Sequence, residues 1–198
     1  MVNFFKSTWF KCISCLLILL LFSGVSISIL SNLLYVSPEE RLARSITKIY
    51  GEEKKYEVIL DEKVDCGDFG YIDKIFLVGN KSEKTYDYLF HAVGEHGFKD
   101  GSITYWIKVT ADNGTLSIGK MIIESNKSQS FIGSVNESWH SNLYVDVAGA
   151  KYLTPWSDVA KNDSDFKHVP TTGATKSKTA SCNAVNSVIY YISQGGLA

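Results

Sequence analysis

The chain has 198 residues and a formal net charge of −1 at pH 7. This length suffices for one ordinary domain and an accessory segment. Proteins that bind nucleic acid carry a surplus of basic residues, so the balanced charge argues against nucleic acid as a partner. Aromatic residues make up 13% of the chain and only 3 residues are proline, which predicts a packed core with many strands.

An apolar segment near the N-terminus is the first recognisable element. No charged residue lies between Cys12 and Pro38, and a helix of that length exceeds the roughly 30 Å hydrocarbon core of a bilayer. We therefore predict a transmembrane anchor over residues 12–36, preceded by a short tail of residues 1–11.

The charges on either side of this segment predict its orientation. Lys6 and Lys11 precede it, and Glu39 and Glu40 follow it. The positive-inside rule then predicts a single-pass plasma-membrane protein with a cytoplasmic N-terminus and an extracytoplasmic C-terminal domain. A cleaved signal peptide is the competing interpretation, although such a peptide has a shorter apolar region and a small-residue cleavage site.

Residues 37–84 are predicted to form a connecting helix and the first strands. Apolar residues at helical spacing predict an amphipathic helix over Pro38–Tyr50. Alternation of apolar and polar residues predicts a strand from Tyr56 to Leu60, and apolar, β-rich runs predict two more strands over residues 71–78 and 86–93.

A β-hairpin is predicted around Asp112-Asn113-Gly114, a strong turn signal between the alternating runs 103–109 and 116–123. After it we expect a polar loop over residues 125–134, a short helix over residues 136–143 and a strand over residues 144–147.

A last helix is predicted over residues 177–194, because its apolar residues fall on one stripe and Gly195-Gly196 follows it. The expected fold class is therefore α+β. An N-terminal transmembrane helix precedes an antiparallel sheet packed with helices, and the C-terminal helix comes after a hydroxyl-rich turn.

Cysteine and histidine residues give little indication of chemistry. Cys66 and Cys182 could pair in an oxidising compartment, but one possible pair is not a disulfide framework. The four histidines are scattered without a ligand spacing, so no metal site is expected. The chain also lacks a Gly-x-Ser-x-Gly elbow, and we expect no catalytic residue of its own.

The turn before the last helix carries the most chemistry, because residues 171–185 read TTGATKSKTASCNAV. A helix N-terminus presents unpaired N–H groups and a partial positive charge, which favour an anion. Small and hydroxyl-bearing residues let a phosphate come close and donate to it. Ser and Thr also cap helices, so the pattern alone favours a simple cap over a phosphate site. The residues concerned are Thr172, Gly173, Ala174, Thr175, Lys176 and Ser177.

This stretch resembles the flavinylation motif of the FMN-binding domain family, found in the G subunit of the Rnf electron-transport complex and the C subunit of the sodium-translocating NADH:quinone reductase. In that family a Ser/Thr-Gly-Ala-Thr/Ser signature ends in a hydroxyl residue that carries FMN through a phosphoester bond. Thr172-Gly173-Ala174-Thr175 matches it. The resemblance implies that Thr175 carries covalent FMN, with Ser177 at a second hydroxyl position.

The likeness extends to the preceding residues. Gly97-Phe98-x-x-Gly101-x-Ile103 and the following hairpin resemble the hairpin before the flavin site in that family. Glu124 and the loop up to Gly133 correspond to the loop that lies against the isoalloxazine ring. The resemblance therefore implies an FMN-binding domain over residues 85–198. Trp139 is a candidate for an aromatic wall beside the ring.

The resemblance implies a membrane-anchored, extracytoplasmic flavoprotein that relays electrons, acting as a carrier subunit more than as a stand-alone enzyme. Its partners would be a flavin transferase for maturation and membrane redox subunits or other electron carriers. The alternative is a membrane-anchored, cofactor-free binding or adhesion domain, in which Thr172 or Thr175 merely caps a helix.

Overall fold

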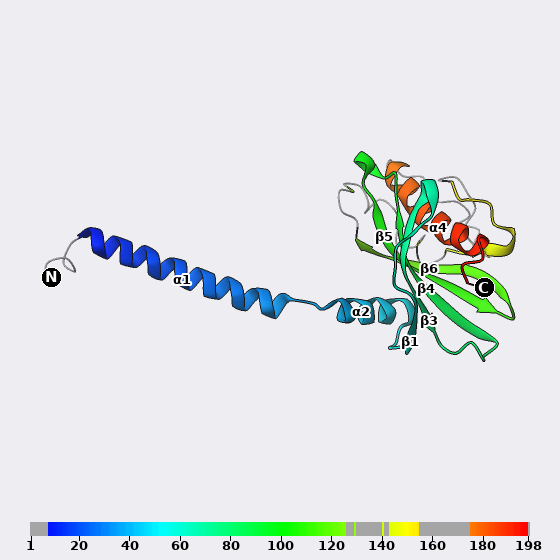
Figure 1. The fold of residues 1–198 in the computed structure, drawn as a ribbon, viewed down its shortest axis with the longest axis horizontal. Coiled ribbons are helices and arrows are strands. Elements are labelled where there is room, and N and C mark those ends of the chain that lie inside the picture. Colours follow the sequence, from blue (N-terminus) through cyan, green and yellow to red (C-terminus); the bar gives the residue numbers. More distant parts are fainter. Residues whose placement is uncertain (1–7, 126–128, 130–139, 141–142, 155–174, 198) are drawn as a thin grey trace. The chain divides into compact units, whose positions relative to one another are not determined.

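The structure, a computed structural model, describes residues 8–125, 129, 140, 143–154 and 175–197 (Figure 1). The chain divides into two compact units, residues 1–42 and 43–198. The fold class is α+β, as predicted: an N-terminal apolar helix, an antiparallel sheet and a C-terminal helix.

The main element of the first unit is helix α1, Thr8–Leu34. It begins four residues before, and ends two residues before, the anchor expected over residues 12–36. Its 27 residues span about 40 Å at roughly 1.5 Å per residue. Within the described residues it is the one helix long and apolar enough to cross a membrane, judged by length and composition.

Helix α2, Pro38–Tyr50, has the predicted bounds. The Ser37 hydroxyl accepts a hydrogen bond from the Glu40 backbone amide at 3.1 Å, and Pro38 occupies the first helical position, as is common in helix starts. In the second unit, the end of α2 lies against the sheet, where the Lys120 ammonium donates to the Lys48 carbonyl oxygen at 2.8 Å.

The described strands form one antiparallel sheet in the order β1-β3-β4-β5-β6-β7, with β2 also paired to β3. Because β3 and β4 are paired neighbours, the division expected between residues 84 and 85 falls in the turn that joins them. The strands are β1 Tyr56–Leu60, β2 Val64–Asp65, β3 Gly70–Val78, β4 Thr85–Gly94, β5 Ile103–Asp112, β6 Thr115–Ser125 and β7 Val145–Asp146.

The predicted hairpin is confirmed by the pairing of β5 with β6. Its turn places Asn113 at φ 48° and Gly114 at φ 84°, the left-handed values that an Asn-Gly pair accepts in a tight hairpin. Strand β7 is shorter than the expected strand over residues 144–147, because a 3-10 turn over Val147–Gly149 follows it directly. Most of the expected helix over residues 136–143 lies outside the described residues.

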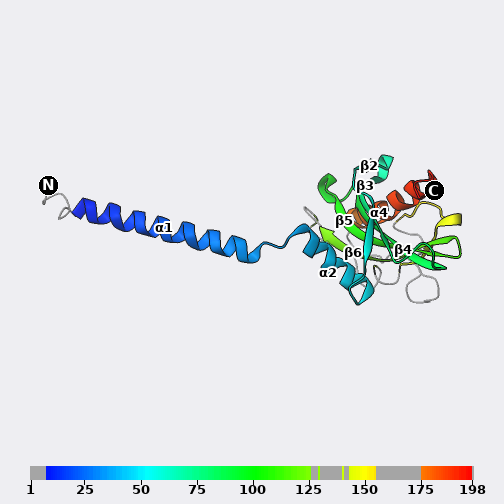
Figure 2. The same cartoon turned by 60° about the horizontal axis from the view of Figure 1, so that its bottom comes forward.

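Helix α4, Thr175–Ser193, starts two residues earlier than predicted and lies across one face of the sheet in both views (Figure 1, Figure 2). Its predicted apolar stripe is buried in the core against β3, β4 and β5, except for the partly buried Ile192. The two cysteines of this unit, Cys66 and Cys182, are also buried, and both are free thiols.

Candidate functional site

Thr175, the expected flavin acceptor, is the first residue of α4, and its side chain is exposed, as is that of Lys176. The preceding signature residues Thr172, Gly173 and Ala174 lie outside the described residues. So does Trp139, the candidate for an aromatic wall.

Ser177 differs from Thr175 although the two hydroxyls are only two positions apart. Ser177 is 1% exposed, and its Oγ donates to Gln129 Oε1 at 2.9 Å. The Ser177 hydroxyl is therefore committed to an internal hydrogen bond, while the Thr175 side chain remains accessible to solvent.

Gln129 joins three segments that are distant in the sequence. Its Oε1 accepts from Ser177 and also from the Phe98 backbone amide at 3.0 Å, while its Nε2 donates to the Phe98 carbonyl oxygen at 3.3 Å. Gly97 leaves room for this amide, because a Cβ atom there would lie 2.7 Å from Gln129 Nε2. The start of α4, the turn at Gly97-Phe98 and the loop after β6 thus meet at one buried side chain.

The sequence did not single out Gln129. Its environment is set by two partners, Phe98 and Ser177, that lie 31 and 48 positions away along the chain. The sequence could have pointed to Gln129 only indirectly, because both of its partners belong to segments that carry the family resemblance.

Buried polar contacts continue under the second turn of α4. The Ser181 hydroxyl lies 2.6 Å from the Tyr105 hydroxyl and donates to the Ser177 carbonyl oxygen at 3.0 Å. The Tyr105 hydroxyl also lies 3.3 Å from His140 Nε2. Burial, with a smaller contribution from the charge of Lys48, lowers the pKa of His140 to about 4, so this imidazole is neutral at pH 7.

The backbone turn that contacts Gln129 adopts an uncommon conformation. His96, Lys99 and Asp100 have φ values of 63°, 54° and 55°, in the left-handed region that L-residues with side chains seldom occupy. Such conformations persist where surrounding contacts fix them. One contact comes from α4, where Asn183 Nδ2 donates to the Glu95 carbonyl oxygen at 2.9 Å.

Lys178 lies one turn after Thr175 and is 1% exposed. Burial lowers the pKa of its ammonium group, because a charged amine loses hydration inside the protein. Positions three apart lie on the same side of a helix, so Lys178 and Thr175 share one side of the first turn of α4.

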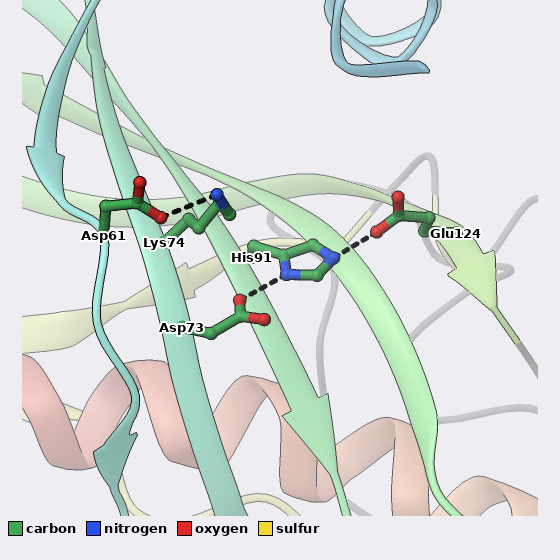
Figure 3. Close-up of polar contacts among 5 residues, drawn as sticks. All are labelled: Asp61, Asp73, Lys74, His91 and Glu124. Carbon is green, nitrogen blue, oxygen red and sulfur yellow. Dashed lines mark hydrogen bonds and ion pairs between the residues drawn. The ribbon is translucent and has the colours of Figure 1, made fainter. Parts of the chain in front are cut away.

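Glu124, the other expected flavin-binding residue that the structure describes, lies elsewhere. Its carboxylate contacts His91 Nε2, and the Asp73 carboxylate contacts Nδ1 of the same ring (Figure 3). His91 follows Phe90, which packs on Tyr191 of α4. Because successive side chains of a strand point to opposite faces, this cluster lies on the sheet face opposite α4.

The two carboxylates keep His91 positively charged. Burial by itself lowers the pKa of His91, but the hydrogen bonds and charges of Asp73 and Glu124 outweigh it and raise the pKa to about 9. The ring also stacks on Trp106, with 4.3 Å between centroids. An ion pair between Lys74 and Asp61, at 2.6 Å, lies beside the cluster (Figure 3).

This arrangement is suited to holding strands together. Asp73, His91 and Glu124 come from β3, β4 and β6, and the two carboxylates bind opposite nitrogens of the ring, so they do not converge on one point (Figure 3). In the described part of the chain, no group of three or more His, Cys, Asp or Glu residues is placed to hold a metal ion.

Comparison with models of known protein families finds no match, and comparisons with curated protein sequences and with solved structures find none either.

Proposed function

We propose that this chain is a membrane-anchored, extracytoplasmic flavoprotein that carries FMN on Thr175 and relays electrons. The observation that carries the proposal is the convergence at Gln129. The Gly97-Phe98 turn, the segment after Glu124 and the helix start after the Thr-Gly-Ala-Thr signature each carry part of the family resemblance. They meet at Gln129, whose partner Ser177 lies two positions after the exposed Thr175.

Accessibility favours Thr175 over Ser177 as the acceptor. A transferase must bring a bulky flavin nucleotide to the hydroxyl, which is feasible at an exposed side chain and not at one that is 1% exposed. A phosphoester requires an activated donor, and FAD is a donor of this class. The bond between Thr175 Oγ1 and the FMN phosphorus forms as the phosphoanhydride bond to AMP breaks, and the hydroxyl proton is released to solvent.

Covalent attachment would keep the flavin nucleotide on the protein. The dipole of α4 would stabilise a phosphate at its N-terminus by about 0.3–2 kcal/mol, which is too little to keep a flavin nucleotide in an open compartment. Bound FMN would supply the redox chemistry, and the chain would supply attachment, orientation and electrostatic tuning. Lys176, which is exposed next to Thr175, would bring positive charge to the same turn of the helix as the phosphate.

The apolar helix α1 supports the anchored part of the proposal by its length and composition. An anchored carrier exchanges electrons with partners at the same membrane, so the expected partners are membrane redox subunits or other electron carriers. A dedicated flavin transferase would act before them, during maturation.

The test uses the full chain, co-expressed with a flavin transferase and purified from membranes in detergent. We expect flavin fluorescence on the protein band of a denaturing gel and an intact mass increased by one FMN residue. Thr175→Ala should abolish both signals. Thr179→Ala, a matched change one turn later on α4, should keep them. A chain that takes up no flavin with several transferases would favour the cofactor-free binding or adhesion domain instead.

A further inference from the structure

We infer that Gln129 is a positioning residue, which fixes the first turn of α4 to the Glu95–Gly101 turn and so holds Thr175 where a transferase can use it. This inference rests on the proposed function, because it gives Gln129 a role in flavin attachment at Thr175. It adds a residue that the signature itself does not contain.

The hydrogen-bonding capacity of Gln129 is used on both sides. Its amide oxygen accepts from the Phe98 amide and the Ser177 hydroxyl, and its amide nitrogen donates to the Phe98 carbonyl oxygen. Gln129 is 7% exposed, so water does not replace these contacts readily. Because Gln129 both accepts from and donates to Phe98, the orientation of its amide group relative to the turn is fixed, whereas a single hydrogen bond would let the group rotate.

The two segments that Gln129 joins both depend on contacts with neighbouring parts of the chain to hold their conformation. The Glu95–Gly101 turn contains His96, Lys99 and Asp100 in left-handed conformations, which surrounding contacts must maintain. The first turn of a helix has backbone N–H groups without intrahelical partners and frays easily. Gln129 binds the middle of the turn, at Phe98, and the third residue of α4, Ser177.

The link from Gln129 to Thr175 passes through Ser177. When Ser177 is held inward, the chain around Thr175 is fixed in helical geometry and the Thr175 side chain projects outward. If Gln129 is removed, the buried Ser177 hydroxyl loses its partner and the first turn can unwind. Thr175 would then sample many orientations, and only some of them suit attack on a bound donor.

The experiment compares Gln129→Ala with Gln194→Ala, an exposed glutamine just beyond the far end of α4. The full-length chain in detergent micelles receives purified transferase and FAD, and attachment is followed as flavin fluorescence of the gel band. Gln129→Ala loses all three hydrogen bonds of the side chain, and we expect it to slow attachment about tenfold. Gln194→Ala should leave the rate unchanged.

Gln129→Glu adds a second measurement, the pH dependence of the attachment rate, which depends on the hydrogen bonds of this side chain. A protonated carboxyl group can still accept from Ser177 and donate to the Phe98 carbonyl oxygen, whereas the ionised carboxylate cannot donate. Attachment to Gln129→Glu should therefore recover toward the wild-type rate as the pH falls through the pKa of the new carboxyl group. The wild-type chain should lack this recovery.

Hydrogen exchange on the flavin-free chain separates this inference from the proposed function. In Gln129→Ala, backbone amides of residues 95–101 and 175–181 should exchange faster, and those of β5 should not change. Unchanged exchange in both segments would overturn the inference, whatever the attachment rate. Faster exchange with an unaltered attachment rate would overturn the role in flavinylation. A wild-type chain that takes no flavin would defeat the proposed function while exchange still tested the coupling.

Discussion

Gly94 of β4 lies directly against Ala180 of α4. A Cβ atom built on Gly94 would lie 1.8 Å from the Ala180 carbonyl oxygen and 2.5 Å from the Ala184 amide nitrogen, so the strand and helix backbones are in contact. Only glycine permits this approach. The contact fixes the height of the N-terminal half of α4 above the sheet, and with it the position of the helix start that carries Thr175.

Gly94→Ala should therefore destabilise the domain by about 2–4 kcal/mol, because the added methyl group pushes backbone against backbone. Gly119→Ala is the matched control, since the nearest atom to its added Cβ would be 3.9 Å away. We expect that change to stay within about 1 kcal/mol of wild type. Urea unfolding of the full chain in detergent measures both, and equal stabilities for the two variants would contradict the packing described.

His91 should stabilise the domain at neutral pH and lose its effect in alkali. Its pKa is about 9 in the folded chain against 6.5 in the reference state. The stabilisation is therefore complete below pH 6.5 and is lost as the pH rises through about 9, and it amounts to at most roughly 3 kcal/mol. Unfolding from pH 6 to pH 10 should show this loss in the wild type and not in His91→Gln. An imidazole that titrates near pH 6.5 by NMR would refute the double ion pair.

The contribution of His140 to stability should have the opposite pH dependence to that of His91. Its folded-state pKa is about 4, below the reference value of 6.5, so the neutral form is the one that the fold favours. The contribution is present above pH 6.5 and is lost as the pH falls toward 4. We expect His140→Gln to flatten the acid side of the stability profile and to leave the alkaline side unchanged. A folded-state His140 resonance that titrates above pH 6 would show this reasoning to be wrong.

The Tyr105 hydroxyl should contribute measurably to the stability of the domain. It lies 2.6 Å from the Ser181 hydroxyl and 3.3 Å from His140, and the side chain is fully buried. Tyr105→Phe removes both of these buried contacts, so we expect a loss of about 1–3 kcal/mol in unfolding free energy. Tyr152→Phe changes a side chain that is 45% exposed and should cost little. If both variants unfold alike, the buried network carries no net stability.

The anchor and its orientation can be tested together. We expect the intact mass of protein purified from membranes to include the residues of α1, since a cleaved signal peptide would remove them. Ser82→Cys adds a thiol at an exposed position between β3 and β4. A membrane-impermeant maleimide added to whole cells should label it. Labelling that occurs only after lysis would contradict the orientation proposed from the flanking charges.

The local elements could be read from the sequence because their determinants lie close together along the chain. Apolar spacing predicted the bounds of α2, and Asp112-Asn113-Gly114 predicted the hairpin. Helix α4 starts two residues early because Thr175 and Lys176 add exposed residues to a helix whose apolar stripe begins later.

The clusters of side chains could not be read in the same way. His91 of β4 is paired with Trp106 of the neighbouring strand β5, and that pairing cannot be read from a local pattern. No local pattern places Asp73 and Glu124 on either side of one ring. Glu124 was expected beside a flavin for its place in the sequence, whereas its described contact is with His91 on the face away from α4.

The two buried thiols have a consequence for where this protein can work. Burial raises the pKa of Cys66 to about 11 and that of Cys182 to about 12, so both stay protonated and unreactive in the folded chain. Because neither thiol is cross-linked in the fold described, a reductant has no disulfide to break in this domain. The described fold is therefore compatible with a reducing as well as with an oxidising compartment.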